Sequence, residues 1–287
     1  MGTCPHCGSV GRVYVEAFAD TLDKCRSCGL IYLEPAPSQA QMVARHASEE
    51  YAAHPYFEKG EEIAKRNILP LHEIALGILS KHLPIGSRVL DVGAGTGDFI
   101  EIAAEHYTVS AIEPSPLLAE KIRNRMACPV FVGAFEDYHQ PESADAVILM
   151  DIIEHAADPR KLLAQVRRTL RPGGLVFIST VDSASLLYRL GPIIWKVSKY
   201  SRFADYLLHR IFCKQHNWYF NRRVLGDIVK ATGFTVLDHQ GFEFPLSRLK
   251  EKALVLLGLR TLYFFHFLLG SNTEQYLVAQ NGHVTDR

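Results

Sequence analysis

The chain has 287 residues, and its 31 basic and 31 acidic side chains give a formal net charge of zero. No overall positive charge draws it to nucleic acid, and the polar residues 4–11 do not resemble a secretory signal peptide. The length suits a core domain with attachments, and the expected compartment is the cytoplasm. In that reducing compartment, six cysteines predict a metal site before disulfides.

Two Cys-x-x-Cys-Gly motifs lie at residues 4–8 and 25–29. Four thiolates can hold one tetrahedral Zn²⁺ with no coordination position left open, which is typical of a structural site. We therefore predict a zinc ribbon at residues 1–37, with a hairpin near residues 13–18, and a redox dithiol pair as the alternative. His6 lies between two ligands and is expected to be a solvated neighbour. The predicted metal ligands are Cys4, Cys7, Cys25 and Cys28.

The predicted ribbon is slightly acidic. Residues 1–40 carry three basic side chains against four acidic ones. A module that follows a phosphate backbone should be basic, so nucleic acid is not a favoured partner. Residues 25–32, followed by Pro35 and Pro37, instead resemble the zinc-binding segment that precedes small-molecule methyltransferases, including sugar C-methyltransferases. The resemblance implies that the ribbon shapes the substrate side of a cleft.

Residues 38–84 are predicted to form a helical cover. Helical periodicity runs over residues 61–82 and is interrupted at Pro70. The segment resembles the helices that lie over bound S-adenosylmethionine (SAM) in such enzymes. A helix that packs its apolar face on the core is the simpler alternative.

The stretch Arg-Val-Leu-Asp-Val-Gly-Ala-Gly-Thr-Gly-Asp-Phe at residues 88–99 organises the predicted core, residues 85–184. Its apolar residues predict a buried parallel strand, and its glycines predict a tight turn against which a ligand can lie. A pyrophosphate-binding turn has the spacing Gly-x-Gly-x-x-Gly, whereas this turn is Gly-x-Gly-x-Gly. Asp91 and Asp98 would repel a diphosphate. A cationic ligand without phosphate is therefore favoured over NAD.

These residues resemble motif I of the class I SAM methyltransferases, in which the acidic residue, here Asp91, helps to orient the methionine amino group. Residues 108–113 predict a second strand, ending in Glu113, whose carboxylate can accept both ribose hydroxyls. The resemblance places the adenine near residues 133–137, after a third strand. The predicted cofactor-binding residues are Asp91, Gly93, Ala94, Gly95, Gly97, Glu113, Pro114, Phe135, Glu136, Met150 and Asp151.

The apolar residues 144–150 predict a central parallel strand, whose carboxyl end delivers Glu154 and His155 to the cleft. Methyl transfer is an in-line displacement, so a base is needed only if the acceptor must lose a proton. The pair resembles the Glu-His of ubiquinone-type O-methyltransferases, and His155 is our candidate base. Alternatively, both residues cap the next helix, which Asp158 and Pro159 also begin.

A helix is predicted over residues 162–170, followed by a stop and turn at Arg171-Pro172-Gly173-Gly174 and a strand over residues 175–181. Residues 185–221, the lid segment, are then predicted to form a helical insertion that binds substrate. Residues 185–230 combine nine basic residues with many apolar ones. This composition favours an anionic amphiphilic substrate or contact with a membrane surface, with a cap packed on the core as the alternative. His216 resembles a family histidine near the acceptor and is a second candidate acid or base.

Residues 222–287 complete the predicted core with a helix, a strand, an apolar segment at residues 253–270 and a final antiparallel strand. Arg260 near the middle of the apolar segment would cost about 3 kcal/mol in a bilayer, so a spanning helix is not expected. The segment is instead expected to pack on the protein, on a second subunit or in a bilayer interface.

The sequence therefore predicts an α/β fold: a Rossmann-like, seven-stranded methyltransferase sheet with an N-terminal zinc ribbon and a helical lid. The predicted activity is SAM-dependent methylation of an oxygen or carbon atom of a small molecule, with lipid-like molecules and nucleotide-linked sugars as candidate acceptors. Two alternatives remain: an RNA or protein methyltransferase that uses the ribbon for recognition, and a non-catalytic SAM-binding protein.

Overall fold

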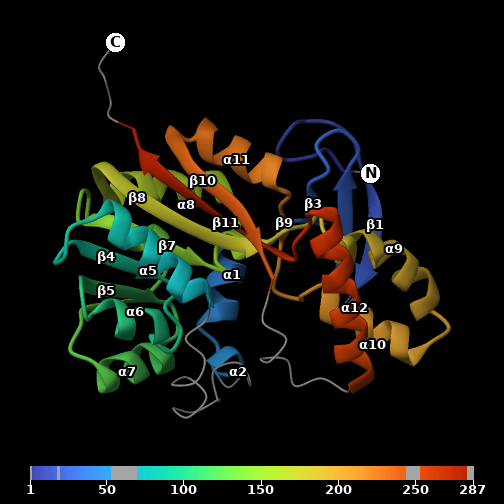
Figure 1. Cartoon of the computed structure of the whole chain (residues 1–287), viewed down its shortest axis with the longest axis horizontal. Coiled ribbons are helices and arrows are strands. Elements are labelled where there is room, and N and C mark those ends of the chain that lie inside the picture. The colour runs from blue at the N-terminus through green and yellow to red at the C-terminus, as the bar shows by residue number, and fades with distance from the viewer. Residues whose placement is uncertain (1, 18–19, 53–69, 244–252, 283–287) are drawn as a thin grey trace.

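The computed structural model describes residues 2–17, 20–52, 70–243 and 253–282 (Figure 1). A seven-stranded sheet has the order β10-β11-β8-β7-β4-β5-β6, and a four-stranded sheet has the order β1-β2-β3-β9. The strands of the large sheet are β4 (Arg88–Val92), β5 (Thr108–Glu113), β6 (Val130–Val132), β7 (Ala144–Met150), β8 (Leu170–Val181), β10 (Phe234–Phe242) and β11 (Glu274–Asn281).

The large sheet is parallel from β6 to β8, and β11 runs antiparallel to both β8 and β10. This arrangement confirms the predicted Rossmann-like sheet with an antiparallel last strand. All residues of β7 up to Leu149 are buried, as the apolar composition of a central parallel strand requires.

Helices cover both faces of this sheet. One face packs on α5 (Pro70–His82), α6 (Asp98–Ala103) and α7 (Pro116–Arg125), and the other on α8 (Pro159–Thr169) and α11 (Arg222–Ala231). Local signals start several of these helices. The side chain of Ser115 accepts a hydrogen bond from the N–H of Leu118 ahead of α7, and that of Asp158 accepts from the N–H groups of Arg160 and Lys161 ahead of α8. The cap of α8 is thus Asp158, so Glu154 and His155 do not cap that helix.

One sequence prediction about local structure is wrong, and part of another lies outside the described residues. The stop predicted at residues 171–174 lies within β8, because Leu170 pairs with Ala144 and Leu175 pairs with Ala146, which makes the intervening residues a bulge. The helix predicted over residues 61–82 begins at Pro70 within the described chain, and residues 53–69 lie outside it. Helix α5 packs Leu71, Ala75 and Leu79 on the sheet, which agrees with the simpler of the two interpretations.

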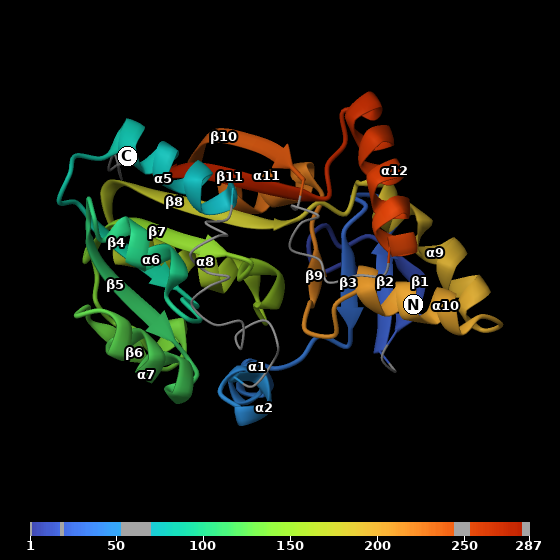
Figure 2. The same cartoon turned by 60° about the horizontal axis from the view of Figure 1, so that its bottom comes forward.

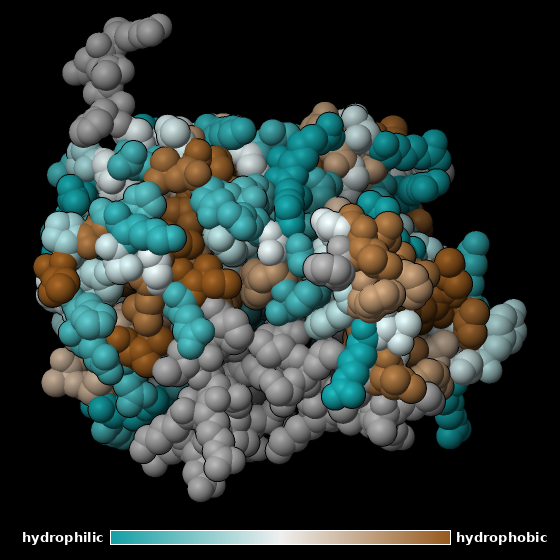
Figure 3. Space-filling model, in the orientation of Figure 1, coloured by the Kyte–Doolittle hydropathy of each residue, from teal (hydrophilic) through white to brown (hydrophobic). Residues whose placement is uncertain are grey.

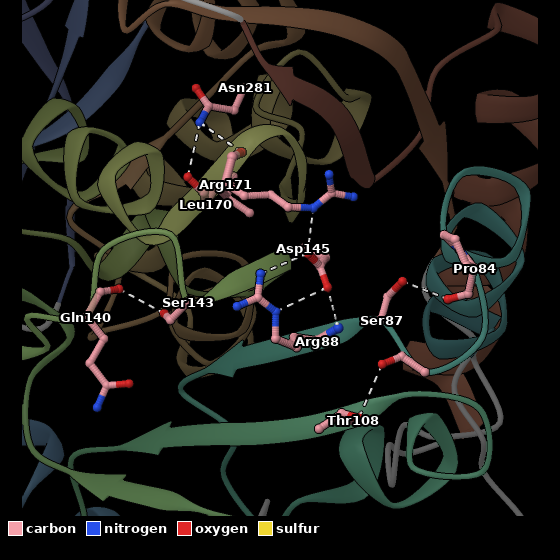
Figure 4. Close-up of polar contacts among 11 residues, drawn as sticks. Pro84, Ser87, Arg88, Thr108, Gln140, Ser143, Asp145, Leu170, Arg171 and Asn281 are labelled. Atoms are coloured by element: carbon pink, nitrogen blue, oxygen red, sulfur yellow. Dashed lines mark hydrogen bonds and ion pairs between the residues drawn. The ribbon is translucent and has the colours of Figure 1, made fainter.

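Asp145 ties three strands together at the amino edge of the sheet (Figure 4). Its Oδ2 atom accepts a hydrogen bond from the backbone N–H of Arg88 at 2.7 Å, and its Oδ1 atom lies 3.1 Å from Nη2 of the same residue. Arg171 of β8 also forms an ion pair with Asp145. These contacts stabilise the edge opposite to the one where open parallel sheets bind ligands.

The four-stranded sheet is built from both ends of the chain. It contains β1 (Gly11–Ala17), β2 (Asp20–Cys25), β3 (Ile31–Glu34) and β9 (Trp218–Tyr219). Strand β9 belongs to the lid segment, and it pairs with β3 through Ile31 opposite Tyr219 and Tyr32 opposite Trp218. The predicted ribbon and the end of the predicted lid therefore share one sheet.

The lid helices α9 (Leu186–Ser198) and α10 (Arg202–Ile211) pack on this small sheet (Figures 1 and 2). Tyr188, Leu208 and Phe212 are buried against Val15 and Ile31 of the ribbon strands. The lid segment thus packs its buried apolar side on the ribbon. We call the combined unit of β1, β2, β3, β9, α9 and α10 the ribbon–lid module.

Candidate functional site

The glycine turn after β4 forms as the sequence indicates. Gly93, Gly95 and Gly97 all have positive φ angles, of 73°, 57° and 83°. The N–H of Gly93 donates to the carbonyl of Ile112 on β5 at 2.8 Å, which fixes the turn against the neighbouring strand. A Cβ atom on Gly93 would lie 2.2 Å from Cδ1 of Ile152. The turn therefore requires glycine for both its backbone conformation and its close packing.

Two buried carboxyl groups flank the turn. Glu113 is 2% exposed, and its two oxygens accept hydrogen bonds from the N–H groups of Gly95 at 2.8 Å and Ser115 at 2.9 Å. Burial raises the pKa of Glu113 to about 7. Burial, with the nearby charge of Glu113, raises the pKa of Asp91 to about 8. Because a cation favours the ionised form of a neighbouring carboxyl, this pair suits a positively charged ligand that also carries hydroxyl groups.

A pocket opens beside the turn, at the carboxyl edge of the sheet. Five of the predicted cofactor or catalytic positions line it together with Gly93: Glu113, Pro114, Phe135, Glu136 and His155. Phe135 and Glu136 belong to a short 3-10 helix, η1 (Phe135–Asp137), after β6. The donor set of backbone, buried carboxyl and apolar surface fits a nucleoside with a cationic end, which is what SAM presents.

Six predicted cofactor residues do not line this pocket. Asp91 is buried beneath the turn, and Met150 packs into the core of the sheet. Asp151 has a φ angle of 54° and accepts a hydrogen bond from the hydroxyl of Ser179. Ala94, Gly95 and Gly97 form part of the turn but are not among the residues that line the pocket. The direct roles of these residues toward a cofactor stay predictions.

Helix α1 (Gln39–His46) forms a wall of the pocket. From the sequence, these residues were predicted only to belong to the helical cover over residues 38–84. Gln39, Met42, Val43 and His46 line the pocket, and Figure 2 shows α1 beyond the carboxyl edge of the sheet. Ser38 and Gln41 form a capping box at the start of this helix. The Ser-x-x-Gln pattern is a sequence signal for a helix N-terminus, so the start of α1 could have been predicted. Which face of α1 meets the pocket depends on tertiary packing.

The two candidate bases lie together. The ring centroids of His155 and His216 are 4.8 Å apart, and those of His155 and His46 are 5.4 Å apart. His155 lies in a short 3-10 helix, η2 (Ile153–His155), and His216 lies just before β9. Their placement therefore agrees with the prediction that both histidines lie near one site. His46 is a third histidine of this cluster, and the sequence did not indicate it.

The protonation state of this cluster follows from its burial. Burial, aided by His216 and His46, lowers the pKa of His155 well below its ordinary value. Burial also lowers the pKa of His216 to about 4, and burial with the charge of Asp151 raises the pKa of Glu154. Nε2 of His216 and Oε1 of Glu154 are 4.0 Å apart, a spacing that would suit an ion pair, but both shifts favour the neutral forms. We therefore describe Glu154 as a neutral acid beside two neutral imidazoles.

The tautomer of His155 follows from a single contact. Its Nδ1 atom lies 2.9 Å from the backbone oxygen of Gln215. A carbonyl oxygen only accepts hydrogen bonds, so Nδ1 must carry the proton. In the neutral ring, Nε2 is then the free acceptor.

Asn217 and Trp218 hold the turn that carries these groups. The backbone N–H of Asn217 donates to the carbonyl of Glu154 at 2.8 Å, and its side chain Nδ2 donates to the carbonyl of His155 at 2.8 Å. Nε1 of Trp218 donates to the carbonyl of Ala156 at 2.6 Å. Strand β9 therefore joins η2 to the ribbon, an arrangement that no local sequence pattern indicated.

The four predicted zinc ligands cluster at one end of the ribbon. Their sulfur atoms all lie within 4.8 Å of one another, with Cys4 and Cys28 at 3.7 Å and Cys7 and Cys25 at 3.4 Å. Sulfur atoms in a tetrahedral centre with Zn–S bonds of about 2.3 Å lie about 3.8 Å apart, so the residues fit the metal. No disulfide joins any of the six cysteines. His6 is not simply solvated, because its Nδ1 atom lies 3.2 Å from Nη2 of Arg160 on α8.

The fold and the pocket define a class I, Rossmann-like methyltransferase. A methyltransferase domain family matches residues 51–239, more than half of the chain, and the chain belongs to this family. Membership of this family supports SAM-dependent methyl transfer as the activity of the chain.

Curated relatives are ubiquinone biosynthesis O-methyltransferases. The protein of Azotobacter vinelandii is 28% identical over 225 residues, which cover 71% of this chain and 89% of that protein. The protein of Xylella fastidiosa is 32% identical over 136 residues, 43% of this chain and 55% of that protein. The chain thus spans about half the length of the Xylella fastidiosa relative.

Two solved structures share the fold. Haemonchus contortus phosphoethanolamine N-methyltransferase 2 in complex with S-adenosyl-L-methionine aligns over 88% of this chain and 62% of that chain, with a TM-score of 0.55 and 18% identity. A Haloferax volcanii complex of a methyltransferase with the Trm112 methyltransferase activator aligns over 82% and 97%, with a TM-score of 0.57 and 17% identity. At these identities the likeness shows the fold alone.

Proposed function

We propose that the chain transfers the methyl group of SAM to an oxygen or activated carbon of a small molecule. Lipid-like molecules and nucleotide-linked sugars are the candidate acceptor classes. The observation that carries the proposal is the neutral His155, which lines the pocket with Nε2 as its free acceptor atom. The ubiquinone biosynthesis O-methyltransferase relatives support an oxygen acceptor.

When bound, SAM supplies the electrophilic methyl group. Glu113, which lines the pocket, would hold its hydroxyl groups, Asp91 beneath the turn would supply negative charge for its cationic end, and the turn at Gly93 would let it lie against the backbone. Nε2 of His155 accepts the proton that the acceptor loses, while the contact between Nδ1 and the carbonyl of Gln215 keeps the ring in the correct orientation. Glu154, as a neutral acid, avoids placing a fixed negative charge beside the imidazoles.

We further propose that Cys4, Cys7, Cys25 and Cys28 bind one structural zinc ion. Four cysteine ligands leave no position for substrate, so the metal stabilises the ribbon rather than taking part in methyl transfer.

The test is methyl transfer by the purified, zinc-loaded protein to a panel of phenols, polyprenylated phenols and nucleotide sugars, followed by mass spectrometry of S-adenosylhomocysteine. His155→Ala should lower kcat by about 10²-fold to 10⁴-fold and change the Kd of SAM only a few-fold. His139→Ala is the matched control, because His139 is an exposed histidine that does not line the pocket. Since the lowered pKa of His155 keeps it neutral, its protonation should not reduce kcat between pH 8 and pH 6.

Turnover within a few-fold of the parent in His155→Ala would exclude the base assignment. Tight SAM binding with no turnover on any acceptor would favour the non-catalytic alternative. Methylation of RNA, with binding that weakens steeply with salt, would favour the RNA methyltransferase alternative, although the acidic ribbon argues against it.

A further inference from the structure

Three helices expose apolar side chains at the end of the molecule that lies away from the pocket. On α12 (Ala253–Leu269), Phe264 and Leu268 are each 59% exposed, and Leu269 is 67% exposed. On α9, Ile193 is 60% and Val197 is 49% exposed, and on α10 Phe203 is 48% exposed. We call these six residues the apolar face.

On α12, two residues of the apolar face, Phe264 and Leu268, belong to an exposed helical stripe, and Leu269 lies beside it. Leu257, Thr261, Phe264 and Leu268 are spaced by four, three and four residues, so they lie along one side of the helix, and all are exposed. A surface helix of a globular domain normally turns such a stripe inward. Here the stripe faces solvent.

The opposite side of α12 is held on the protein by polar contacts. His266 is fully buried, and its Nδ1 atom lies 2.9 Å from Oε1 of Glu243, just after β10. The second oxygen of Glu243 accepts a hydrogen bond from the hydroxyl of Thr273 at 2.8 Å. These contacts fix the rotation of α12, so its apolar stripe cannot turn inward without breaking them.

The exposed stripes of the three helices belong to one region of the surface. Figures 1 and 2 both show α12 beside α9, with α10 at the same end of the molecule. In Figure 3, hydrophobic residues gather over α12 and continue toward the margin formed by α9 and α10. An apolar region of this extent typically marks an interaction surface.

Cations accompany the apolar face. Arg189, Lys196, Lys199 and Arg202 are exposed on α9, on α10 and between them, and Arg260 is exposed on α12. Asp205 is the acidic residue among the described parts of these helices. A second copy of the chain docked face to face would bring these cations together, whereas a surface with acidic headgroups over an apolar interior complements both features.

We propose that the apolar face docks on the anionic surface of a lipid bilayer, with α9, α10 and α12 lying in the plane of the interface. Amphipathic helices with basic flanks bind membranes in this way, and they bury their apolar side in the headgroup region. In the described parts of the chain, no helix is long and apolar enough to cross a membrane. The inference is independent of the acceptor and of the base assignment.

The test is flotation of the full-length, zinc-loaded protein with vesicles of phosphatidylcholine alone and of phosphatidylcholine with about 30% phosphatidylglycerol. The wild-type protein should float with the anionic vesicles and much less with the neutral ones. The double variant Phe264→Gln/Leu268→Gln should reduce the bound fraction at least tenfold. Lys196→Glu/Lys199→Glu should remove the preference for the anionic vesicles, because each basic residue near the surface contributes to the attraction.

Ile85→Gln is the matched control, because Ile85 is 82% exposed in the turn between α5 and β4, and it should float like the wild type. Circular dichroism and SAM binding establish that every variant is folded. Failure of the wild-type protein to float with either vesicle would overturn the proposal, as would unchanged flotation of Phe264→Gln/Leu268→Gln. A stable dimer in solution that the same double variant dissociates would assign the face to a second copy and also overturn it.

Discussion

The seven-stranded sheet and the ribbon–lid module are stabilised in different ways. The sheet buries apolar residues on both faces; its five parallel strands come from residues 88–181, and β10 and β11 add to it from residues 234–281. The ribbon–lid module joins residues near 30 to residues near 218, and its cysteine cluster lies at one end of a small sheet. A segment of this size buries little core by itself, so it depends on a metal and on the distant strand β9.

This difference separates two tasks at the site. The sheet presents the glycine turn, Asp91 and Glu113, which we propose bind the cofactor. In the ribbon–lid module, the N–H of Leu33 donates to the carbonyl of Asn217 at 2.8 Å, and Asn217 in turn donates to the carbonyls of Glu154 and His155 in η2. Damage to the sheet site should therefore reduce cofactor binding, and damage to the ribbon should reduce turnover.

Loss of the proposed zinc should produce the largest effect. Cys28→Ser should unfold the ribbon, because structural zinc supplies about 10–16 kcal/mol in small zinc-binding peptides. Asn221 Nδ2 donates to the carbonyl of Cys28 at 2.9 Å, so the damage should reach β9 and its neighbour Asn221. We expect turnover to fall at least 100-fold and the Kd of SAM to change less than about fivefold, with faster amide exchange in β9.

Metal analysis, hydrogen exchange, calorimetry and a turnover assay check this prediction. Cys213→Ser is the control, since Cys213 is an exposed thiol outside the cluster and its replacement should change none of these measurements. Equal losses of SAM binding and turnover in Cys28→Ser would show that the two regions are not separable.

Asp91→Asn should have the converse effect. The substitution keeps the size of the side chain and removes its charge, and hydrogen bonds to charged groups contribute about 1.5–3 kcal/mol, so the Kd of SAM should rise about 10-fold to 100-fold. Protection of the ribbon amides from exchange should stay unchanged. Asp98→Asn is the control, because Asp98 pairs with Arg125 beside the turn and is not buried; an equal loss there would point to general damage to the turn.

The smallest effect is the pH dependence that the two carboxyls of the sheet site contribute. The pKa values of Asp91 and Glu113 are raised to about 8 and about 7. At a pH between the ordinary and the raised pKa of each carboxyl, the folded protein without ligand therefore binds more protons than the unfolded chain. The free energy of unfolding should therefore fall as the pH rises from about 5 to about 8, and level off above that. SAM affinity should rise over the upper part of the same range, because ionised carboxyls bind the cation better.

Urea unfolding and calorimetry at pH 5.5, 7 and 8.5 measure both slopes. Asp91→Asn should reduce both slopes, with the contribution of Glu113 remaining, and Asp98→Asn should leave them unchanged. A free energy of unfolding that rises with pH over this range in the parent protein, and not in Asp91→Asn, would contradict the assigned ionisation states.

Some site features were predictable because they depend on short stretches of chain. The positive φ angles at Gly93, Gly95 and Gly97 follow from glycine spacing after an apolar strand, and Glu113 follows from the length of one crossover. Others were not. Residues 171–174 read as a turn, yet the neighbouring strand β7 pairs with both Leu170 and Leu175 and makes the four residues between them a bulge.

The sequence by itself determined the class of fold, the four-cysteine cluster and the acidic, glycine-rich turn, since each is encoded by short motifs along the chain. Only the tertiary structure decided that α1 walls the pocket, that His46, His155 and His216 meet, and that the lid segment completes the ribbon sheet. These contacts join residues about 60 to 190 positions apart, and which distant surfaces meet is decided by packing of the whole core rather than by any local pattern.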